Sequence, residues 1–159
     1  MKTLVVKDPQ MCSECEDCVN ACKKTHGTAR VRKVGLIPIF CMHCPPDIAP
    51  CRKICPSNAI ELMDEGDGEI LKVNEEKCIL CKLCIMACPV GTIVYDKEKK
   101  SVRKCTLCFD SDKIIPACVD ACKDNALNVL SIEDLQVLEK DENLVEELQK
   151  AIKTFKFSL

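Results

Sequence analysis

The cysteines of this chain form a fourfold repeat, and that repeat limits what the chain can fold into. All 16 cysteines fall into four groups of four, in a chain of 159 residues. Each group begins C-x-x-C and ends C-x-x-x-C. Only the middle gap changes: two residues in the first and third groups, six in the second and nine in the fourth. The groups are Cys12, Cys15, Cys18 and Cys22; Cys41, Cys44, Cys51 and Cys55; Cys78, Cys81, Cys84 and Cys88; and Cys105, Cys108, Cys118 and Cys122.

Short apolar segments flank these groups and extend the repeat. After the last cysteine of groups two, three and four, residues 55–62, 88–95 and 122–129 have the sequences CPSNAIEL, CPVGTIVY and CKDNALNV. Each is typical of a turn followed by a short strand. Strand-like runs also precede the first cysteine at 4–12 and 70–78. One unit is therefore predicted to be strand, cysteine loop, short helix, turn and strand. The fold class is α+β, and two units can pair about a pseudo-two-fold axis.

The chemistry of the cysteines depends on the redox compartment. The apolar run at residues 4–6 is too short for a signal-peptide core, and no stretch approaches the roughly 20 apolar residues of a membrane span. We therefore expect a soluble, cytoplasmic protein, in which thiols stay reduced and disulfides are disfavoured. Structural zinc would use paired C-x-x-C knuckles. The runs at 12–22 and 78–89 instead have the cysteine spacing of bacterial ferredoxins, which bind iron–sulfur clusters.

The longer last gap has a helical explanation. Residues 84–88 are predicted to form one helical turn, which places Cys84 and Cys88 on one face, about 6 Å apart along the axis. One thiol can then complete the cluster of its own group while the other reaches a neighbouring cluster. Pro89 ends the turn because its ring prevents the helix from continuing. Each group therefore needs a partner group.

Two pairings of the groups are open at this point. Adjacent pairing joins group one with two and three with four, whereas nested pairing joins two with three and one with four. The ends of the groups favour nesting, because groups two and three end in Cys-Pro and groups one and four in Cys-Lys. The four dipeptides are Cys55-Pro56, Cys88-Pro89, Cys22-Lys23 and Cys122-Lys123.

The four motifs, with CMHCPPDIAPC at 41–51, resemble the four-cluster ferredoxin subunits of molybdopterin oxidoreductases, formate dehydrogenases, hydrogenases and carbon monoxide dehydrogenase systems. The resemblance covers roughly residues 2–130. It implies two nested bacterial-ferredoxin-like modules, an outer one from 1–35 with 100–130 and an inner one from 36–99. It also implies four [4Fe-4S] clusters. The implied ligand sets are Cys12, Cys15, Cys18 and Cys122; Cys22, Cys105, Cys108 and Cys118; Cys41, Cys44, Cys51 and Cys88; and Cys55, Cys78, Cys81 and Cys84.

The resemblance implies a non-catalytic subunit that conducts single electrons between redox subunits. The expected partner is a catalytic subunit of formate dehydrogenase or hydrogenase type, as in a hydrogen-dependent carbon dioxide reductase of anaerobic metabolism, with a second ferredoxin-like subunit as a further candidate. The alternative is a free polyferredoxin that shuttles electrons by diffusion, for example to carbon monoxide dehydrogenase. The sequence has no G-x-G-x-x-G and no phosphate-binding loop, so nothing in it predicts catalysis.

Two histidines and two basic segments complete the candidate residues. His43 lies inside the second C-x-x-C, where hydrogen bonding beside a cluster competes with simple loop packing as an interpretation. His26 is predicted to be a solvated turn residue. The basic residues at 23–33 and 97–104 are predicted to form a solvated face that offsets cluster charge, with partner docking as the alternative. A formal net charge of −2 and 3% aromatic residues argue against nucleic-acid binding.

Residues 131–159 contain no cysteine and are predicted to form an amphipathic helical tail, with Ser131 as a helix N-cap. Apolar residues recur there at helical spacing. They include Leu144, Val145, Leu148, Ile152 and Phe155. Such a stripe either packs back on the ferredoxin body or forms an assembly contact with another subunit.

Overall fold

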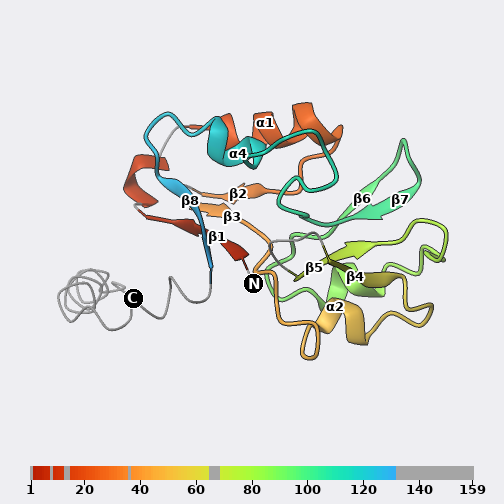
Figure 1. The fold of residues 1–159 in the computed structure, drawn as a ribbon. Helices are drawn as coiled ribbons and strands as arrows, with labels where there is room; N and C mark the ends of the chain where they lie inside the picture. Colours follow the sequence, from red (N-terminus) through yellow and green to blue (C-terminus); the bar gives the residue numbers. More distant parts are fainter. Residues whose placement is uncertain (1, 8, 13–14, 36, 65–68, 132–159) are drawn as a thin grey trace, which may run out of the picture.

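Short strands and short helices alternate along the chain (Figure 1). The computed structural model describes residues 2–131 except 8, 13–14, 36 and 65–68. In chain order the elements are β1 (Lys2–Val6), the 3₁₀ helix η1 (Pro9–Cys12), α1 (Asp17–His26), β2 (Arg32–Val34), β3 (Ile37–Ile39), α2 (Pro50–Lys53), β4 (Ile60–Asp64), β5 (Glu69–Val73), α3 (Leu83–Ala87), β6 (Val94–Asp96), β7 (Ser101–Arg103), α4 (Ala117–Asp120) and β8 (Leu127–Ser131).

The strands pair antiparallel, two by two. β1 pairs with β8 and so joins the two ends of the described chain, with Leu4 opposite Val129. The pairs β2–β3, β4–β5 and β6–β7 are each formed by strands that follow one another in the chain. The strands predicted after groups two, three and four are confirmed as β4, β6 and β8.

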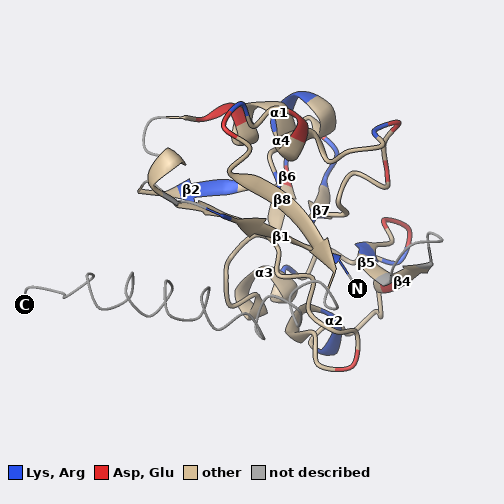
Figure 2. Ribbon diagram, turned by 60° about the vertical axis from the view of Figure 1, so that its left-hand side comes forward, with Lys and Arg blue, Asp and Glu red and all other residues tan. Residues whose placement is uncertain are grey.

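The buried side chains form two clusters. One draws mainly on residues 4–40 and 107–127, and the other on residues 49–102. Helix α1 packs against α4, and α2 packs against α3. Figures 1 and 2 show α1 and α4 on one side of the β1–β8 pair, and α2 toward the other. We call residues 2–40 and 105–131 the end region and residues 41–103 the middle region; Lys104 stands between them.

A left-handed residue closes the turn after each of the last three cysteine groups. Asn58, Gly91 and Asn125 have φ angles of 50°, 61° and 51°. Each stands three residues after the last cysteine of its group, and its N–H donates to that cysteine's carbonyl at 3.1–3.2 Å. Glycine and asparagine are the residues that adopt this conformation most readily. The predicted turns are therefore confirmed, and their composition follows from the backbone angle.

The helical turn predicted at residues 84–88 is also confirmed. Helix α3 spans Leu83–Ala87, and the N–H of Cys88 donates to the carbonyl of Cys84 at 3.2 Å. Pro89 follows, where the chain has already left the helix. Cys84 and Cys88 are thus one helical turn apart, as the spacing requires.

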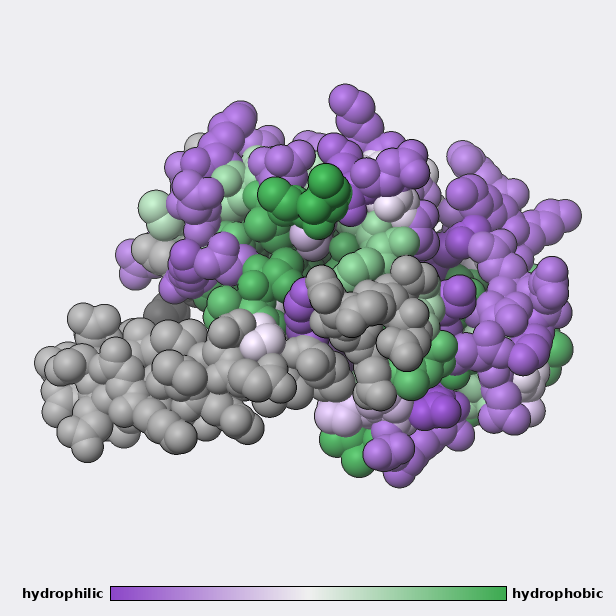
Figure 3. Space-filling model, in the orientation of Figure 1, coloured by the Kyte–Doolittle hydropathy of each residue, from purple (hydrophilic) through white to green (hydrophobic). Residues whose placement is uncertain are grey.

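The predicted tail helix lies in residues 132–159, outside the described residues. Ser131 is the last residue of β8 and lies opposite Lys2 in β1. In the part of the chain that the structure describes, no helix has the length and apolar character needed to cross a bilayer. Figure 3 shows hydrophilic residues over the side that carries β6 and β7, with hydrophobic residues gathered nearer the middle of the same face.

Candidate metal centre

The cysteine loops share a backbone conformation. The third residue of C-x-x-C has a positive φ in groups two, three and four: 47° at His43, 60° at Leu80 and 52° at Leu107. These residues are not glycine, so the conformation is held against its steric cost. Left-handed residues in a tight loop turn successive N–H groups toward one concave side, where they favour an anion. Sequence analysis did not predict this feature, because leucine, which occupies two of the three positions, seldom adopts a positive φ.

Backbone N–H groups already point at cysteine sulfur. The N–H of Arg30 lies 3.2 Å from Cys22 Sγ, and that of Ala59 lies 3.3 Å from Cys55 Sγ. Similar contacts at 3.4 Å reach Cys15, Cys105 and Cys108. A thiolate accepts such bonds well, so these loops are suited to sulfur in its charged, metal-bound form.

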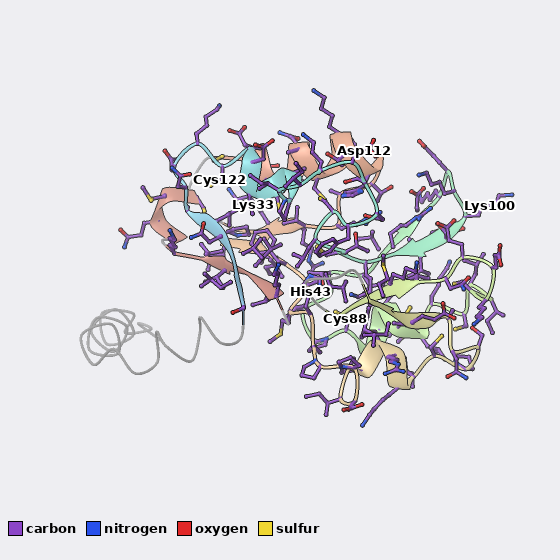
Figure 4. The ribbon with its side chains drawn as sticks, in the orientation of Figure 1. Lys33, His43, Cys88, Lys100, Asp112 and Cys122 are labelled. Carbon is purple, nitrogen blue, oxygen red and sulfur yellow. The ribbon has the colours of Figure 1, made fainter. Side chains whose placement is uncertain are left out.

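Two cavities are each lined by four cysteines from two different groups. Cys12, Cys15, Cys18 and Cys122 line one cavity in the end region. Cys41, Cys44, Cys51 and Cys88 line another in the middle region. Figure 4 labels Cys122 and Cys88, the cysteine that each cavity receives from a distant group. None of the 16 cysteines, all of which lie in the described part of the chain, is in a disulfide bond.

Some of the remaining cysteines also approach one another across groups. Burial, followed by the charges of Cys22 and Cys108, raises the pKa of Cys118 to about 12. Burial, followed by the charges of Cys55 and Cys78, raises the pKa of Cys84 to about 11.

These thiols resist ionisation as long as nothing compensates their charge. Burial and the neighbouring Cys15 likewise raise the pKa of Cys18 to about 11. A metal ion supplies the missing positive charge and displaces the proton, so a folded site of this kind couples metal binding to proton release. Cys81 is exposed at the surface.

The arrangement fits a cluster better than a single ion. Among the residues that the structure describes, no three His, Cys, Asp or Glu side chains converge closely enough to hold one metal ion. One zinc ion would need thiolates about 2.3 Å from a common point. An iron–sulfur cluster instead fills the space between its cysteines, as the two four-cysteine cavities allow.

Comparison with known proteins decides the kind of centre. The sequence pattern of a family described as "4Fe-4S dicluster domain" matches residues 32–132, more than half of the chain. The chain belongs to the 4Fe-4S dicluster domain family. Iron–sulfur ligation is therefore confirmed over the zinc and disulfide alternatives. The matched segment contains cysteine groups two, three and four but not group one. The number of clusters in this dicluster-domain protein therefore stays a prediction. The role of the first group as a cluster ligand also stays a prediction.

The relatives that this chain matches are named as ferredoxins or as components of redox enzymes. An uncharacterized ferredoxin of Methanocaldococcus jannaschii is 48% identical over 138 residues, covering 87% of this chain and 86% of its own. Hydrogenase-4 component A of Escherichia coli is 30% identical, with 86% of each chain covered. The polyferredoxin-like subunit of an aliphatic sulfonate oxidoreductase of Pyrococcus furiosus is 35% identical, covering 78% of this chain and 73% of its own. This dicluster-domain protein is similar to electron-transfer subunits of oxidoreductases.

His26 is not the solvated turn residue that the sequence predicts. It is the last residue of α1, and its side chain is only 5% exposed. Its Nε2 lies 3.2 Å from Cys108 Sγ, and its Nδ1 lies 3.9 Å from a carboxylate oxygen of Asp110. Burial, and then the charge of Arg30, lower the pKa of His26. A sulfur bonded to iron carries no proton, so in that state Nε2–H is the donor.

The basic residues do not all form a solvated face. Lys97, Lys99 and Lys100 are exposed, as predicted. Arg30 and Lys104 are buried, which contradicts the prediction. Figure 2 shows acidic and basic residues on α1 and at the hairpin ends, and basic residues on β2.

Arg30 is buried because it has polar partners inside the end region. Its Nη1 donates to Thr106 Oγ1 at 2.9 Å and forms an ion pair with Asp110 at 2.7 Å. Thr106 Oγ1 in turn donates to Asp110. The side chain of Lys33 binds the first cysteine loop, because its Nζ donates to the carbonyls of Cys12 and Cys15 at 2.6 and 2.7 Å.

His43 is buried beside the second cysteine group, at 4% exposure. Burial, and then the charge of Lys104, lower its pKa to about 3, so the ring is neutral. Neither ring nitrogen has a hydrogen-bond partner within the described part of the chain. Unpaired buried nitrogens are rare, and here they fit an acceptor that the protein itself does not supply. Hydrogen bonding of His43 beside a cluster stays a prediction.

Proposed function

We propose that this chain is the electron-transfer subunit of an oxidoreductase complex and that its sixteen cysteines hold four [4Fe-4S] clusters. The observation that carries the proposal is the pair of cavities that each receive four cysteines from two groups. When bound, such clusters supply one-electron redox chemistry. The chain's own residues hold the sulfurs, donate N–H groups to several of them and bury half of the cysteines.

The proposed ligand sets follow nested pairing of the groups. The two cavities support two of the four sets directly, because Cys122 joins group one and Cys88 joins group two. The proximity of Cys118 to Cys22 and of Cys84 to Cys55 supports the other two sets. Adjacent pairing would instead require Cys122 to meet group three and Cys22 to meet group two.

The proposed partner is a redox subunit of a hydrogenase or formate dehydrogenase type of complex, such as a hydrogen-dependent carbon dioxide reductase. The likeness to hydrogenase-4 component A supports this class of partner. A contact surface is also available around the exposed Cys81. Ile79, Leu83 and Met86, on α3 and the loop before it, are 64%, 40% and 85% exposed. Three exposed apolar side chains so close to a proposed cysteine ligand are suited to contact with another protein.

The experiment is anaerobic purification of the untagged chain from its own cells, followed by iron and acid-labile sulfide analysis. Four clusters predict about 16 iron atoms and about 16 sulfides per chain. They also predict co-elution with a catalytic redox subunit. A chain that binds about eight iron atoms under full reconstitution would contradict the four-cluster proposal.

A second candidate is a free polyferredoxin that carries electrons by diffusion. The relative from Methanocaldococcus jannaschii is named as a ferredoxin and not as a subunit of a complex, which favours a free electron carrier. The same purification separates the two candidates. Elution of the brown chain alone, with full iron content and reversible reduction, would support the free carrier and contradict the subunit proposal.

A further inference from the structure

Lys104 is a buried cation at the boundary between the end and middle regions. Its exposed fraction is 3%. The ammonium group donates to the carbonyl of Leu71 at 2.7 Å and to that of Cys105 at 3.2 Å. Within the described residues, these carbonyls are its hydrogen-bond partners, and no carboxylate forms an ion pair with it.

A buried ammonium without an opposite charge is costly. Carbonyl oxygens replace part of its hydration but carry no net charge, so they leave most of the cost in place. The buried Arg30 shows the usual solution, since it pairs with the carboxylate of Asp110. Lys104 lacks such a partner, so its burial points to a negative charge that the side chains of the described residues do not provide.

The surroundings of Lys104 identify that charge. Lys104 lines the cavity of Cys41, Cys44, Cys51 and Cys88. It is also the chain neighbour of Cys105, which belongs to the proposed set with Cys118. The Lys104 side chain therefore lies at a cysteine-lined cavity on one side of the boundary and hydrogen-bonds to the first cysteine of group four on the other.

We propose that Lys104 is the internal counter-ion of two clusters, one in the cavity that contains Cys88 and one beside Cys105. The inference rests on the proposed function, because each cubane with four thiolates carries a net charge of about −2. Reduction adds a further electron to a site that is already negative. A nearby fixed positive charge stabilises the reduced form more than the oxidised form and so raises the reduction potential.

The alternative is a purely structural lysine that ties β5 to the fourth cysteine group through two hydrogen bonds. Three substitutions separate the two roles. Lys104→Met removes the charge and the donors, Lys104→Gln removes the charge but keeps an N–H donor, and Lys104→Arg keeps both. Lys97→Met is the matched control, because it removes one lysine charge from the exposed β6–β7 hairpin.

The test is a potentiometric titration of the anaerobically purified holoprotein, followed by electron paramagnetic resonance, with iron content measured on each variant. We expect two of the cluster potentials to shift to more negative values in Lys104→Met and Lys104→Gln. The potentials of Lys104→Arg and Lys97→Met should stay at parental values. Cysteine variants of the two proposed sets, Cys51→Ala and Cys118→Ala, identify the signals that move.

Each result bears on the proposal. Unshifted potentials in Lys104→Gln, with full iron content, would overturn it, because the hydrogen bonds alone would then explain the buried lysine. A shift confined to clusters other than those marked by Cys51 and Cys118 would also overturn it. If Lys104→Met loses iron, the potentials of Lys104→Gln decide the question. Iron content of the parent tests the proposed function separately, so the two failures are distinguishable.

Discussion

The end and middle regions hold the same cysteine motif but surround it differently. In the end region five of the eight cysteines are buried, whereas in the middle region three of eight are buried. Buried or half-buried cationic and imidazole side chains contact the motifs of the end region, and they belong to His26, Arg30 and Lys33. In the middle region, loop backbone and the hydroxyl groups of Ser57 and Thr92 contact cysteine sulfur. His43 is buried inside the second motif without a hydrogen-bond partner among the described residues, and Lys104 lies at the border of the region.

Helix length explains part of this difference. Helix α1 has ten residues, and Cys18, Cys22 and His26 recur at intervals of four on one face. The helix therefore delivers one more side chain, a full turn beyond its last cysteine. Helix α3 has five residues and ends at Ala87, so Cys88 and Pro89 lie just beyond it. The residue after the last cysteine of a group thus helps to decide whether the helix continues. Only a helix that continues can place a further side chain, such as His26, beside a cysteine sulfur.

The largest effect expected is the loss of one cluster from one region. Under nested pairing, Cys122→Ala should abolish the same paramagnetic signal as Cys12→Ala, in the end region. Cys88→Ala should abolish the same signal as Cys41→Ala, in the middle region. The physical reason is that a cubane left with three thiolates loses its fourth iron corner or fails to assemble. If Cys122→Ala instead removed the signal that Cys78→Ala removes, adjacent pairing would be correct.

A smaller effect is expected from His26, which has no counterpart on α3. His26→Ala should shift one cluster potential to a more negative value, because it removes the N–H donor at Cys108 Sγ that stabilises the more negative, reduced state. The same titration of Cys108→Ala identifies the cluster concerned. Lys24→Ala, which alters an exposed residue of the same helix, is the control. Parental potentials in His26→Ala, at full iron content, would show that the contact has no electrostatic role.

The smallest expected effect is a loss of folding stability on substitution of the left-handed residue in the turn that both regions share. Gly91→Ala in the middle region and Asn125→Ala in the end region should each cost about 1–2 kcal/mol, because alanine is strained at positive φ. The added Cβ at Gly91 would lie 2.8 Å from Nη2 of Arg32, a flexible side-chain end that can move aside. Asn125→Gly should be close to neutral. The measurement is denaturant unfolding under anaerobic conditions, and equal stability of parent and both alanine variants would exclude the strain argument.

The local structure of this chain could be predicted from the sequence because it depends on neighbours only a few positions away. The turn at Asn125, the helical turn from Cys84 to Cys88 and the strands after the cysteine groups all follow from residue type and spacing. The iron–sulfur chemistry follows for the same reason, since four thiols at fixed short intervals leave few alternatives.

The surroundings of the sulfurs could not be predicted, because they depend on contacts between distant positions. His26 and Cys108 are 82 positions apart, Arg30 and Thr106 are 76 apart, and Lys104 and Leu71 are 33 apart. In the sequence these three basic side chains look like any solvated residues. The amino-acid sequence by itself determined where the cysteine loops form and what they bind. Only the tertiary structure decided which charges lie buried beside them, because burial depends on which segments pack together.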